Sequence, residues 1–208
     1  MRILHILDHS IPLHSGYTFR TVSILREQRK LGWKTFHLTS PKHAGSLEEE
    51  DVEGWHFFRT PWKSRGNRPA FFDELALMHR VERRLLTVAR AVKPDVLHAH
   101  SPVLNAIPAI RVGRRLGLPV IYEVRAFWED AAVDHGTTKE GSLRYRLTRR
   151  LETYALKRAD HVTTICEGLR NDMVARGVDA EKVTVIPNAV DIESFKVSGV
   201  PDLSLIHI

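Results

Sequence analysis

Short apolar segments alternate with longer segments of helical periodicity along most of the chain. Residues 2–7, "RILHIL", are nearly all apolar and predict a buried strand. From about Tyr17 to Leu31 apolar residues recur at helical spacing, and Gly32 is placed to end this helix. The apolar positions of the helix are Phe19, Val22, Ile24, Leu25 and Leu31. Residues 33–40, "WKTFHLTS", alternate between polar and apolar and predict a second strand.

The middle of the chain contains one further strand and one long helix. The acidic run at 48–51 predicts a solvated loop or hairpin, 54–60 ("GWHFFRT") a strand, and 61–69 a basic loop. Apolar residues then recur at i, i+3 and i+4 until Lys93 and Pro94, which predicts a helix. We expect all of its apolar positions in the core: Phe72, Leu75, Met78, Val81, Leu85, Val88 and Val92.

The second half repeats the alternation. The predicted strands are 96–100, 120–124, 161–165 and 182–188. The predicted helices are 103–116, a helix marked by Leu143, Leu147, Leu151 and Tyr154, and 167–177. Residues 127–141 are predicted to form a long polar and aromatic loop.

Strands that alternate with helices in this way are typical of an α/β fold. We predict a Rossmann-like, doubly wound and mainly parallel sheet with helices on both faces. In such sheets ligands bind outside the carboxyl ends of the strands. This rule brings the loops at 8–16, 98–102, 123–130 and 166–168 to one rim.

The loop after the first strand carries Gly16 directly before a helix. Glycine lets a ligand approach the backbone closely, and a helix N-terminus offers N–H groups to an anion. The sequence is not G-x-G-x-x-G, and no acidic residue occupies the position of a ribose contact, which argues against a nicotinamide dehydrogenase. The alternative is an ordinary turn between strand and helix.

Two further rim segments carry charged side chains. His98 and His100 share one side of their strand and suit structural hydrogen bonds or catalysis, but no carboxylate pattern accompanies them, and we expect no metal site. Glu123 and Arg125 share one side of the next strand. They form either a structural ion pair or, with Glu129, Asp130 and His135 nearby in the sequence, a site that binds a polyhydroxylated ligand and supplies a base.

Composition narrows the class of protein. The 208 residues are 43% hydrophobic and 27% charged, as in ordinary globular proteins. The single cysteine, Cys166, excludes an internal disulfide and fits a reducing compartment. The N-terminus does not resemble a signal peptide, and no apolar run is long enough to span a membrane.

The net charge of +6 suits an anionic partner or a solubility bias. Zinc-ligand spacing, RNA-binding signatures and dense basic blocks do not occur, so we expect no nucleic-acid partner. Residues 144–158 contain six Lys or Arg and one Glu with leucines at i, i+4 and i+8. As a helix this segment would bury one stripe, and its cationic face would either be solvated or rest on anionic headgroups.

These motifs together resemble the amino-terminal half of retaining family 4 glycosyltransferases, over about residues 1–196. The similarity lies in "MRILHIL" with its glycine-bearing loop, "DVLHAHSP", "GLPVIYEV", "RADHVTTICEGLRNDM" and "KVTVIPNAVDIESF". The segments "LDHSIPLHSGYTFRT", "HLTSPKH" and "YEVRAFWEDAAVDHGT" resemble the subgroup associated with exosortase (PEP-CTERM) and exopolysaccharide gene clusters.

The resemblance implies a GT-B arrangement, in which a cleft separates two Rossmann-like domains. Residues 1–189 would form the acceptor-side domain, and 190–208 would begin the crossing to the donor domain. The implied reaction transfers a sugar from a nucleotide-sugar donor to an acceptor hydroxyl with retention. The donor is a substrate, and no cofactor or metal is implied. The acceptor would be a saccharide or lipid-linked saccharide, and the enzyme cytoplasmic or peripheral at the inner membrane through 144–158.

The resemblance also implies roles for individual residues. Ser15 and Gly16 would approach the donor phosphates or the transferred sugar. Further substrate-binding positions would be Tyr17, Ser101, Glu123, Arg125 and Asn188. Where many family members have a histidine after the fifth strand, this chain has Arg125, which stays protonated and is no base. The candidates for a catalytic base are His100, Glu129 and His135, and the choice among them stays open.

The end of the chain departs from the family pattern. The last residues, "DLSLIHI", do not fit the crossing, and no Glu-x7-Glu region follows. We expect a truncated reading frame or an isolated domain, with little or no transferase activity of its own. The alternative to a glycosyltransferase is a non-catalytic module that binds a carbohydrate or nucleotide.

Overall fold

The computed structural model describes residues 1–43, 45–62, 70–134 and 136–190. Within them one sheet has the strand order β3-β4-β2-β1-β5-β6-β7-β8. The strands are β1 (Arg2–Leu7), β2 (Lys34–Thr39), β3 (Glu49–Val52), β4 (Trp55–Phe58), β5 (Val96–His100), β6 (Val120–Val124), β7 (His161–Thr164) and β8 (Val183–Val185). Neighbouring strands are parallel except β3 and β4. The predicted Rossmann-like α/β class is confirmed.

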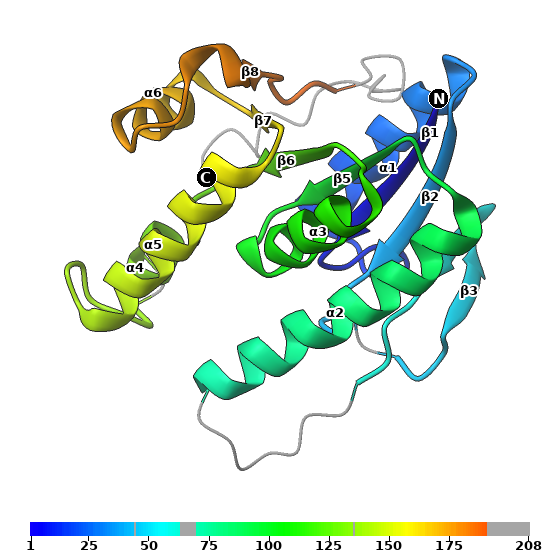
Figure 1. The fold of residues 1–208 in the computed structure, drawn as a ribbon, viewed down its shortest axis with the longest axis horizontal. Coiled ribbons are helices and arrows are strands. Elements are labelled where there is room, and N and C mark those ends of the chain that lie inside the picture. Colours follow the sequence, from blue (N-terminus) through cyan, green and yellow to red (C-terminus); the bar gives the residue numbers. More distant parts are fainter. Residues whose placement is uncertain (44, 63–69, 135, 191–208) are drawn as a thin grey trace, which may run out of the picture.

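Helices cover both faces of the sheet (Figure 1). They are α1 (Gly16–Lys30), α2 (Ala70–Val92), α3 (Val103–Leu116), α4 (Trp128–Asp134), α5 (Leu143–Arg158) and α6 (Glu167–Ala175), with a 3₁₀ turn at Ala180–Lys182. The larger apolar core joins one face of the sheet to α2, α3, α5 and α6. A smaller core around Leu7, Leu25 and Phe57 joins the other face to α1. The face under α1 also carries the polar residues of the site described below.

Local signals explain where several elements begin and end. Gly32 has a φ of +78° directly after α1, as its predicted role at the end of the helix requires. Glu53 and Gly54 both have positive φ and make the tight turn between β3 and β4, which confirms the predicted hairpin. At Gly113 a Cβ atom would collide with the Val120 side chain and a backbone carbonyl. Only glycine therefore lets α3 pack this closely against β6.

The structure corrects several expectations about individual positions. The predicted loop at 127–141 contains α4, because contacts distant in the sequence stabilise these seven residues as a helix. Phe72 and Leu75 are 56% and 42% exposed, not buried. The 23 residues of α2 span roughly 35 Å, whereas strands of five or six residues span under about 20 Å, so its first turns extend past the sheet.

The buried positions of α1 and α5 do not follow their apolar spacing. In α1, Leu25 is buried but Phe19 is exposed, and so is Leu31 directly after the helix. On α5 the leucine stripe is not the buried face, because Leu143 is 83% and Leu147 39% exposed. The buried positions of α5 are Tyr145, Glu152, Ala155 and Leu156.

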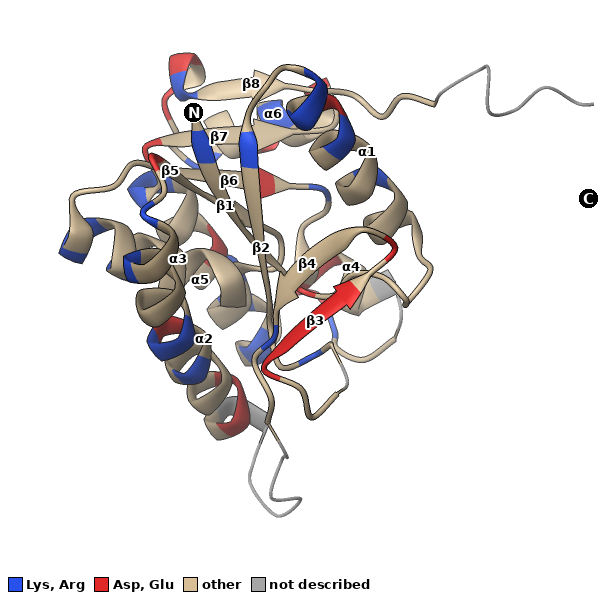
Figure 2. Cartoon of the chain, turned by 90° about the vertical axis from the view of Figure 1, so that its right-hand side faces the viewer, with Lys and Arg blue, Asp and Glu red and all other residues tan. Residues whose placement is uncertain are grey.

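The charge of the edge strand and the hydropathy of the helices agree with the predicted α/β class. Figure 2 shows the acidic strand β3 in red at the sheet edge, where charged side chains oppose pairing with another chain. Across the described ranges, no helix combines the length and apolar character needed to cross a bilayer.

Candidate functional site

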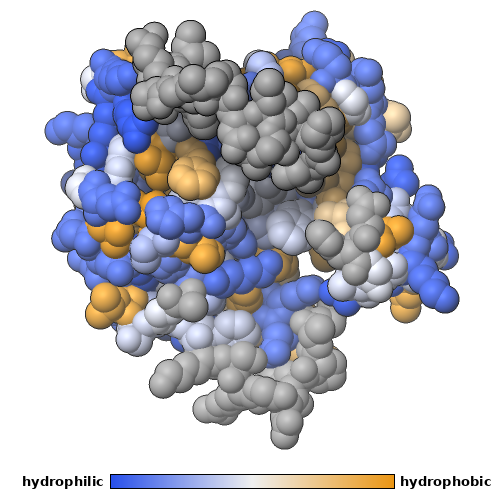
Figure 3. Space-filling view, turned by 180° about the vertical axis from the view of Figure 1, so that it is seen from behind, coloured by the Kyte–Doolittle hydropathy of each residue, from blue (hydrophilic) through white to orange (hydrophobic). Residues whose placement is uncertain are grey.

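A cavity of about 1260 Å³ opens along the carboxyl ends of β1, β5 and β6. On the reverse face shown in Figure 3, orange hydrophobic and blue hydrophilic side chains lie around a recessed centre. The wall of the cavity includes Gly16, Tyr17, Arg20, Ser101, Arg125 and Asn188. At this cavity Arg125 donates a hydrogen bond to the carbonyl of Tyr17, 108 positions earlier in the sequence. The predicted convergence is therefore confirmed for the loops that follow β1, β5 and β6, whereas no residue of 166–168 lines the cavity.

The loop after β1 presents the start of α1 to the cavity. Ser15 is the N-cap: its Oγ accepts from the amide of Thr18 at 3.1 Å, and its carbonyl accepts from the amide of Phe19 at 2.9 Å. The amides of Gly16 and Tyr17 have no partner within the helix. Apart from its own helix backbone and its chain neighbours, no heavy atom of the described residues lies within 4 Å of the place that a Cβ of Gly16 would occupy. The start of α1 can thus receive an anionic group.

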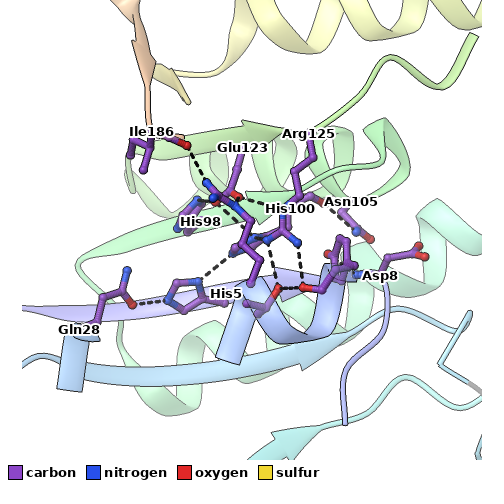
Figure 4. Close-up of polar contacts among 12 residues, drawn as sticks. His5, Asp8, Gln28, His98, His100, Asn105, Glu123, Arg125 and Ile186 are labelled. Atoms are coloured by element: carbon purple, nitrogen blue, oxygen red, sulfur yellow. Dashed lines mark hydrogen bonds and ion pairs between the residues drawn. The ribbon is translucent and has the colours of Figure 1, made fainter. Parts of the chain in front are cut away.

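Glu123, near the end of β6, forms ion pairs with Arg20 and with Arg125, which Figure 4 shows beside it. Its Oε1 accepts from Nε of Arg125 at 2.8 Å and from Nε of Arg20 at 3.0 Å. Because two guanidinium groups share one buried carboxylate, the cluster carries surplus positive charge beside the cavity. Burial by itself would raise the pKa of Glu123. Its contacts with the imidazoles of His100 and His98 and the charge of Arg125 outweigh this effect and hold the pKa of Glu123 well below its usual value.

Arg125 joins the end of β6 to the start of α1. Its Nη1 donates to the carbonyl of Tyr17 at 2.9 Å. Its Nη2 donates to Oγ1 of Thr21 at 3.1 Å and to Nδ1 of His100 at 2.9 Å. The guanidinium also lies over the ring of Tyr17, 4.3 Å from the centroid. These contacts fix Arg125 at the wall of the cavity.

Arg20 connects the same cluster to the segment that follows β8. Its Nη2 donates to the carbonyl of Ile186 at 2.9 Å. Its Nη1 donates to the carbonyl of Pro187 at 3.1 Å and to Oδ1 of Asn188 at 3.0 Å. The carboxylate of Glu123 thus holds both the cavity arginine and, through Arg20, the segment leading away from the sheet.

Three buried histidines lie beside Glu123 on the face under α1. The strand register pairs His5 with His98, and His100 with Glu123. Nδ1 of His5 lies 3.0 Å from Nε2 of His100, and Nε2 of His5 lies 2.9 Å from Oε1 of Gln28. Burial, followed by the charge of His98, lowers the pKa of His5 and that of His100 well below the usual value. Both rings are therefore neutral at pH 7.

The histidine cluster has the composition of a metal site but not its geometry. Nitrogen atoms of His5, His98 and His100 lie within 4.8 Å of one another. The rings of His98 and His100 are stacked, with centroids 4.3 Å apart and planes inclined by 25°. An imidazole binds a metal through a lone pair in the plane of its ring, so nearly parallel rings do not direct their lone pairs to one point. The arrangement suits hydrogen bonding better than metal binding.

The three candidates for a catalytic base have different surroundings. His100 has no exposed surface, and both of its ring nitrogens have side-chain partners. Glu129, on α4, is 1% exposed, and its Oε1 accepts from Nη1 of Arg176. His135 lies outside the described residues. The first two side chains are thus engaged with protein partners.

The predicted binding residues divide into two groups. Those at the cavity wall are Gly16, Tyr17, Ser101, Arg125 and Asn188. Ser15 and Glu123 lie behind that wall as helix cap and ion-pair partner. Sequence reasoning missed Arg20, His5 and Gln28. A signal existed for the first two, since Arg20 follows Gly16 by one helical turn and His5 interrupts an apolar strand.

Comparison with known proteins identifies the family of the chain and solved structures of similar fold. A family model described as a glycosyl transferase 4-like domain matches residues 15–189. A search of curated proteins finds no match. A sucrose-phosphate synthase from Thermosynechococcus elongatus is similar with a TM-score of 0.67 and 12% identity, over 92% of this chain and 49% of that chain.

Two further solved structures are similar over nearly the whole chain. The Anabaena protein HepE in complex with UDP-glucose has a TM-score of 0.63 and 16% identity, over 95% of this chain and 46% of that one. A UDP-GlcNAc 2-epimerase from Methanocaldococcus jannaschii, in complex with UDP-GlcNAc and UDP, has 0.60 and 12%, over 90% and 47%. At these identities the likeness shows a shared fold. The chain spans about half the length of these structures.

Proposed function

The chain belongs to the glycosyl transferase 4-like domain family, and from that membership we propose that residues 1–189 form the acceptor-side domain of a glycosyltransferase and contribute the start of α1 and Arg125 to the binding of its nucleotide-sugar donor. The observation that carries this proposal is the cavity where the open start of α1 meets Arg125. Three solved structures of similar fold are complexes with UDP or UDP-sugars. Because the chain spans about half their length, transfer itself is proposed for a protein that also carries the other half of such a fold.

The donor diphosphate is the group that best matches the charge of this site. Among the described residues, Arg20 and Arg125 share the single carboxylate of Glu123, which leaves one of their positive charges without a counter-ion there. The amides of Gly16 and Tyr17 add the positive end of a 15-residue helix. A diphosphate would neutralise the arginine charge and accept hydrogen bonds from these amides. The chemical contribution of these residues would be to stabilise the charge that develops on the departing nucleoside diphosphate.

Retention and a role in exopolysaccharide or glycoconjugate synthesis are further parts of the proposal. They rest on the resemblance of the rim segments to retaining enzymes of exopolysaccharide gene clusters. NMR of the glycoside formed by a two-domain protein reports whether the anomeric configuration of the donor is kept. Binding of the nucleotide sugar without transfer in that protein would favour the alternative, a non-catalytic carbohydrate- or nucleotide-binding module.

For the acceptor we propose a lipid-linked saccharide reached from a membrane surface. All exposed charges on α5 are positive, because its one acidic residue, Glu152, is buried. Leu143 and Leu147 are exposed among these cations, as in helices that rest on anionic headgroups. Vesicles with anionic lipid should sediment the chain, and L143E/L147E should abolish this, whereas L31E on another exposed leucine, directly after α1, should not. Equal binding to neutral vesicles would contradict the proposal.

Calorimetry of the 208-residue chain tests donor binding directly. We expect it to bind UDP-glucose or another nucleotide sugar, and R125Q to weaken that binding about tenfold or more, as expected for a lost hydrogen bond from a charged group. Arg111 is an exposed arginine of α3 paired with Glu82. The control R111Q should bind like the unmodified chain. Absence of binding across UDP-, GDP- and dTDP-sugars, or equal losses in both variants, would overturn the proposal.

A further inference from the structure

We propose that Gln28, His5 and His100 form a hydrogen-bond chain of fixed direction that holds the Arg125 guanidinium at the cavity. His5 and Gln28 are then positioning residues for nucleotide-sugar binding, although neither lines the cavity. The four side chains come from α1, β1, β5 and the end of β6, and they form an unbroken line of contacts (Figure 4). The inference rests on the role proposed above for Arg125.

The direction of the chain follows from the chemistry of its members. A guanidinium only donates, so Nδ1 of His100 must accept the 2.9 Å hydrogen bond from Arg125. The proton of a neutral His100 is then on Nε2, from which it donates to Nδ1 of His5 at 3.0 Å. His5 in turn carries its proton on Nε2 and donates to Oε1 of Gln28 at 2.9 Å. Each of these hydrogen bonds therefore fixes which ring nitrogen of the next histidine carries the proton.

The opposite direction places two donors against each other. If the amide NH₂ of Gln28 faced His5, the proton of His5 would move to Nδ1 and point at Nε2 of His100. His100 would then need its proton on Nδ1, where it would meet the N–H of Arg125. The hydrogen bond between Arg125 and His100 would then be lost, while the contacts of Arg125 with Glu123, Tyr17 and Thr21 would remain. The acceptor atom at position 28 therefore decides whether Nη2 of Arg125 is also held by His100.

The hydrogen-bond chain matters because it leaves Arg125 with one particular N–H group that can donate to a ligand. A guanidinium has five N–H groups. Within the described residues, Nε uses its N–H on Glu123, and Nη2 uses both of its own on Thr21 and His100. Nη1 uses one on the carbonyl of Tyr17. The fifth N–H, on Nη1, remains for a ligand, and rotation of the guanidinium would change which group faces the cavity.

The first test reads the tautomers in the unmodified chain. Long-range ¹H–¹⁵N NMR spectra distinguish a protonated from a bare ring nitrogen. At pH 7 we expect His5 and His100 to be neutral with the proton on Nε2. An Nδ1 proton on either ring, or a doubly protonated His100 donating to Glu123, would overturn the inference. This measurement requires neither a variant nor a ligand.

The second test uses two substitutions at one position. Gln28→Glu can only accept, and should keep the tautomers, the Arg125 Nε–H resonance and nucleotide-sugar affinity. Gln28→Lys can only donate, and should shift that resonance and weaken affinity about tenfold or more. Gln28 is partly exposed, so we expect both variants to fold. Glu27→Gln on the exposed neighbouring position changes the net charge by the same +1 as Gln28→Lys and should have no effect.

The outcomes separate this inference from the proposed function. If the tautomers are as expected but Gln28→Lys leaves the Arg125 resonance and the affinity unchanged, the chain does not position Arg125 and the inference is wrong. Equal losses of affinity in Gln28→Glu and Gln28→Lys would show that only the shape of glutamine matters, and the inference would again be wrong. If the unmodified chain binds no nucleotide sugar, the proposed function fails, while the Arg125 resonance still decides whether the chain of hydrogen bonds holds the guanidinium.

Discussion

Replacement of Glu123 by glutamine removes the charge on which the arrangement of the site depends. Oε1 of Glu123 accepts from both Arg20 and Arg125, and Oε2 lies 3.3 Å from Nε2 of His98. Glutamine keeps the shape of the side chain but leaves two neighbouring guanidinium groups without a counter-charge. Its NH₂ group would face either the ring of His98 or the two guanidinium groups, and in the second orientation both hydrogen bonds from the arginines are lost.

The expected cost follows from the burial of the carboxylate. Glu123 is 2% exposed, and removal of one partner from a buried ion pair costs about 3–5 kcal/mol. Because the amide oxygen can still accept from the Nε–H groups, we expect the lower end, a loss of about 3 kcal/mol in the free energy of unfolding at pH 7. Glu27 is 64% exposed beside Lys30, and the control Glu27→Gln should change stability by less than about 0.5 kcal/mol.

Urea unfolding over a range of pH measures this loss and its electrostatic origin. The pKa of Glu123 in the folded protein lies below its unfolded value of about 4.3. The stabilisation is therefore complete above that unfolded value and is lost as the pH falls through the lowered folded value. The advantage of the unmodified protein over Glu123→Gln should persist at neutral pH and shrink in acid. Equal stability at pH 7, or an advantage that stays constant in acid, would refute this reasoning.

Three further predictions concern single positions. Gly16→Trp would fill the open space beside the start of α1 and should abolish nucleotide-sugar binding in calorimetry with an unchanged melting temperature; retained binding would remove this loop from the site. Gly113→Ala would clash with Val120, and urea unfolding should show a loss of about 1–3 kcal/mol. Burial raises the pKa of Glu152 to about 8, so the unmodified protein should lose stability relative to Glu152→Gln as the pH rises from about 4.3 toward 8, and parallel pH profiles would contradict this.

Most of the fold is predictable from the sequence because its strands and helices carry strong local signals. The helix at 103–116 coincides with α3, and Gly32 ends α1 as expected. The exceptions depend on contacts between distant residues. The helix α4 places Glu129 against Arg176, 47 positions away, and no periodicity in 127–141 reveals that partner. The exposed first turns of α2 reflect the width of the sheet, which helical periodicity does not encode.

The candidate site is predictable as a location but not as a network. Parallel strands place their carboxyl ends at one edge, so the convergence of Gly16, His100 and Arg125 follows from the order of elements. Which side chains touch depends on strand register and on the position of α1. These pair His100 with Glu123 and direct Arg20 to the same carboxylate. The sequence therefore suggested a base at His100, where the structure shows a buried ring engaged on both sides.

The central claim is that the cavity at the strand ends binds a nucleotide sugar through the start of α1 and Arg125. The most direct measurement is an NMR titration of the ¹⁵N-labelled chain with UDP-glucose and other nucleotide sugars. The account predicts saturable shifts of the Gly16 and Tyr17 amides and of the Arg125 side-chain N–H signals with a single affinity. Shifts confined to other surfaces, or no saturable shift with any nucleotide sugar, would contradict it.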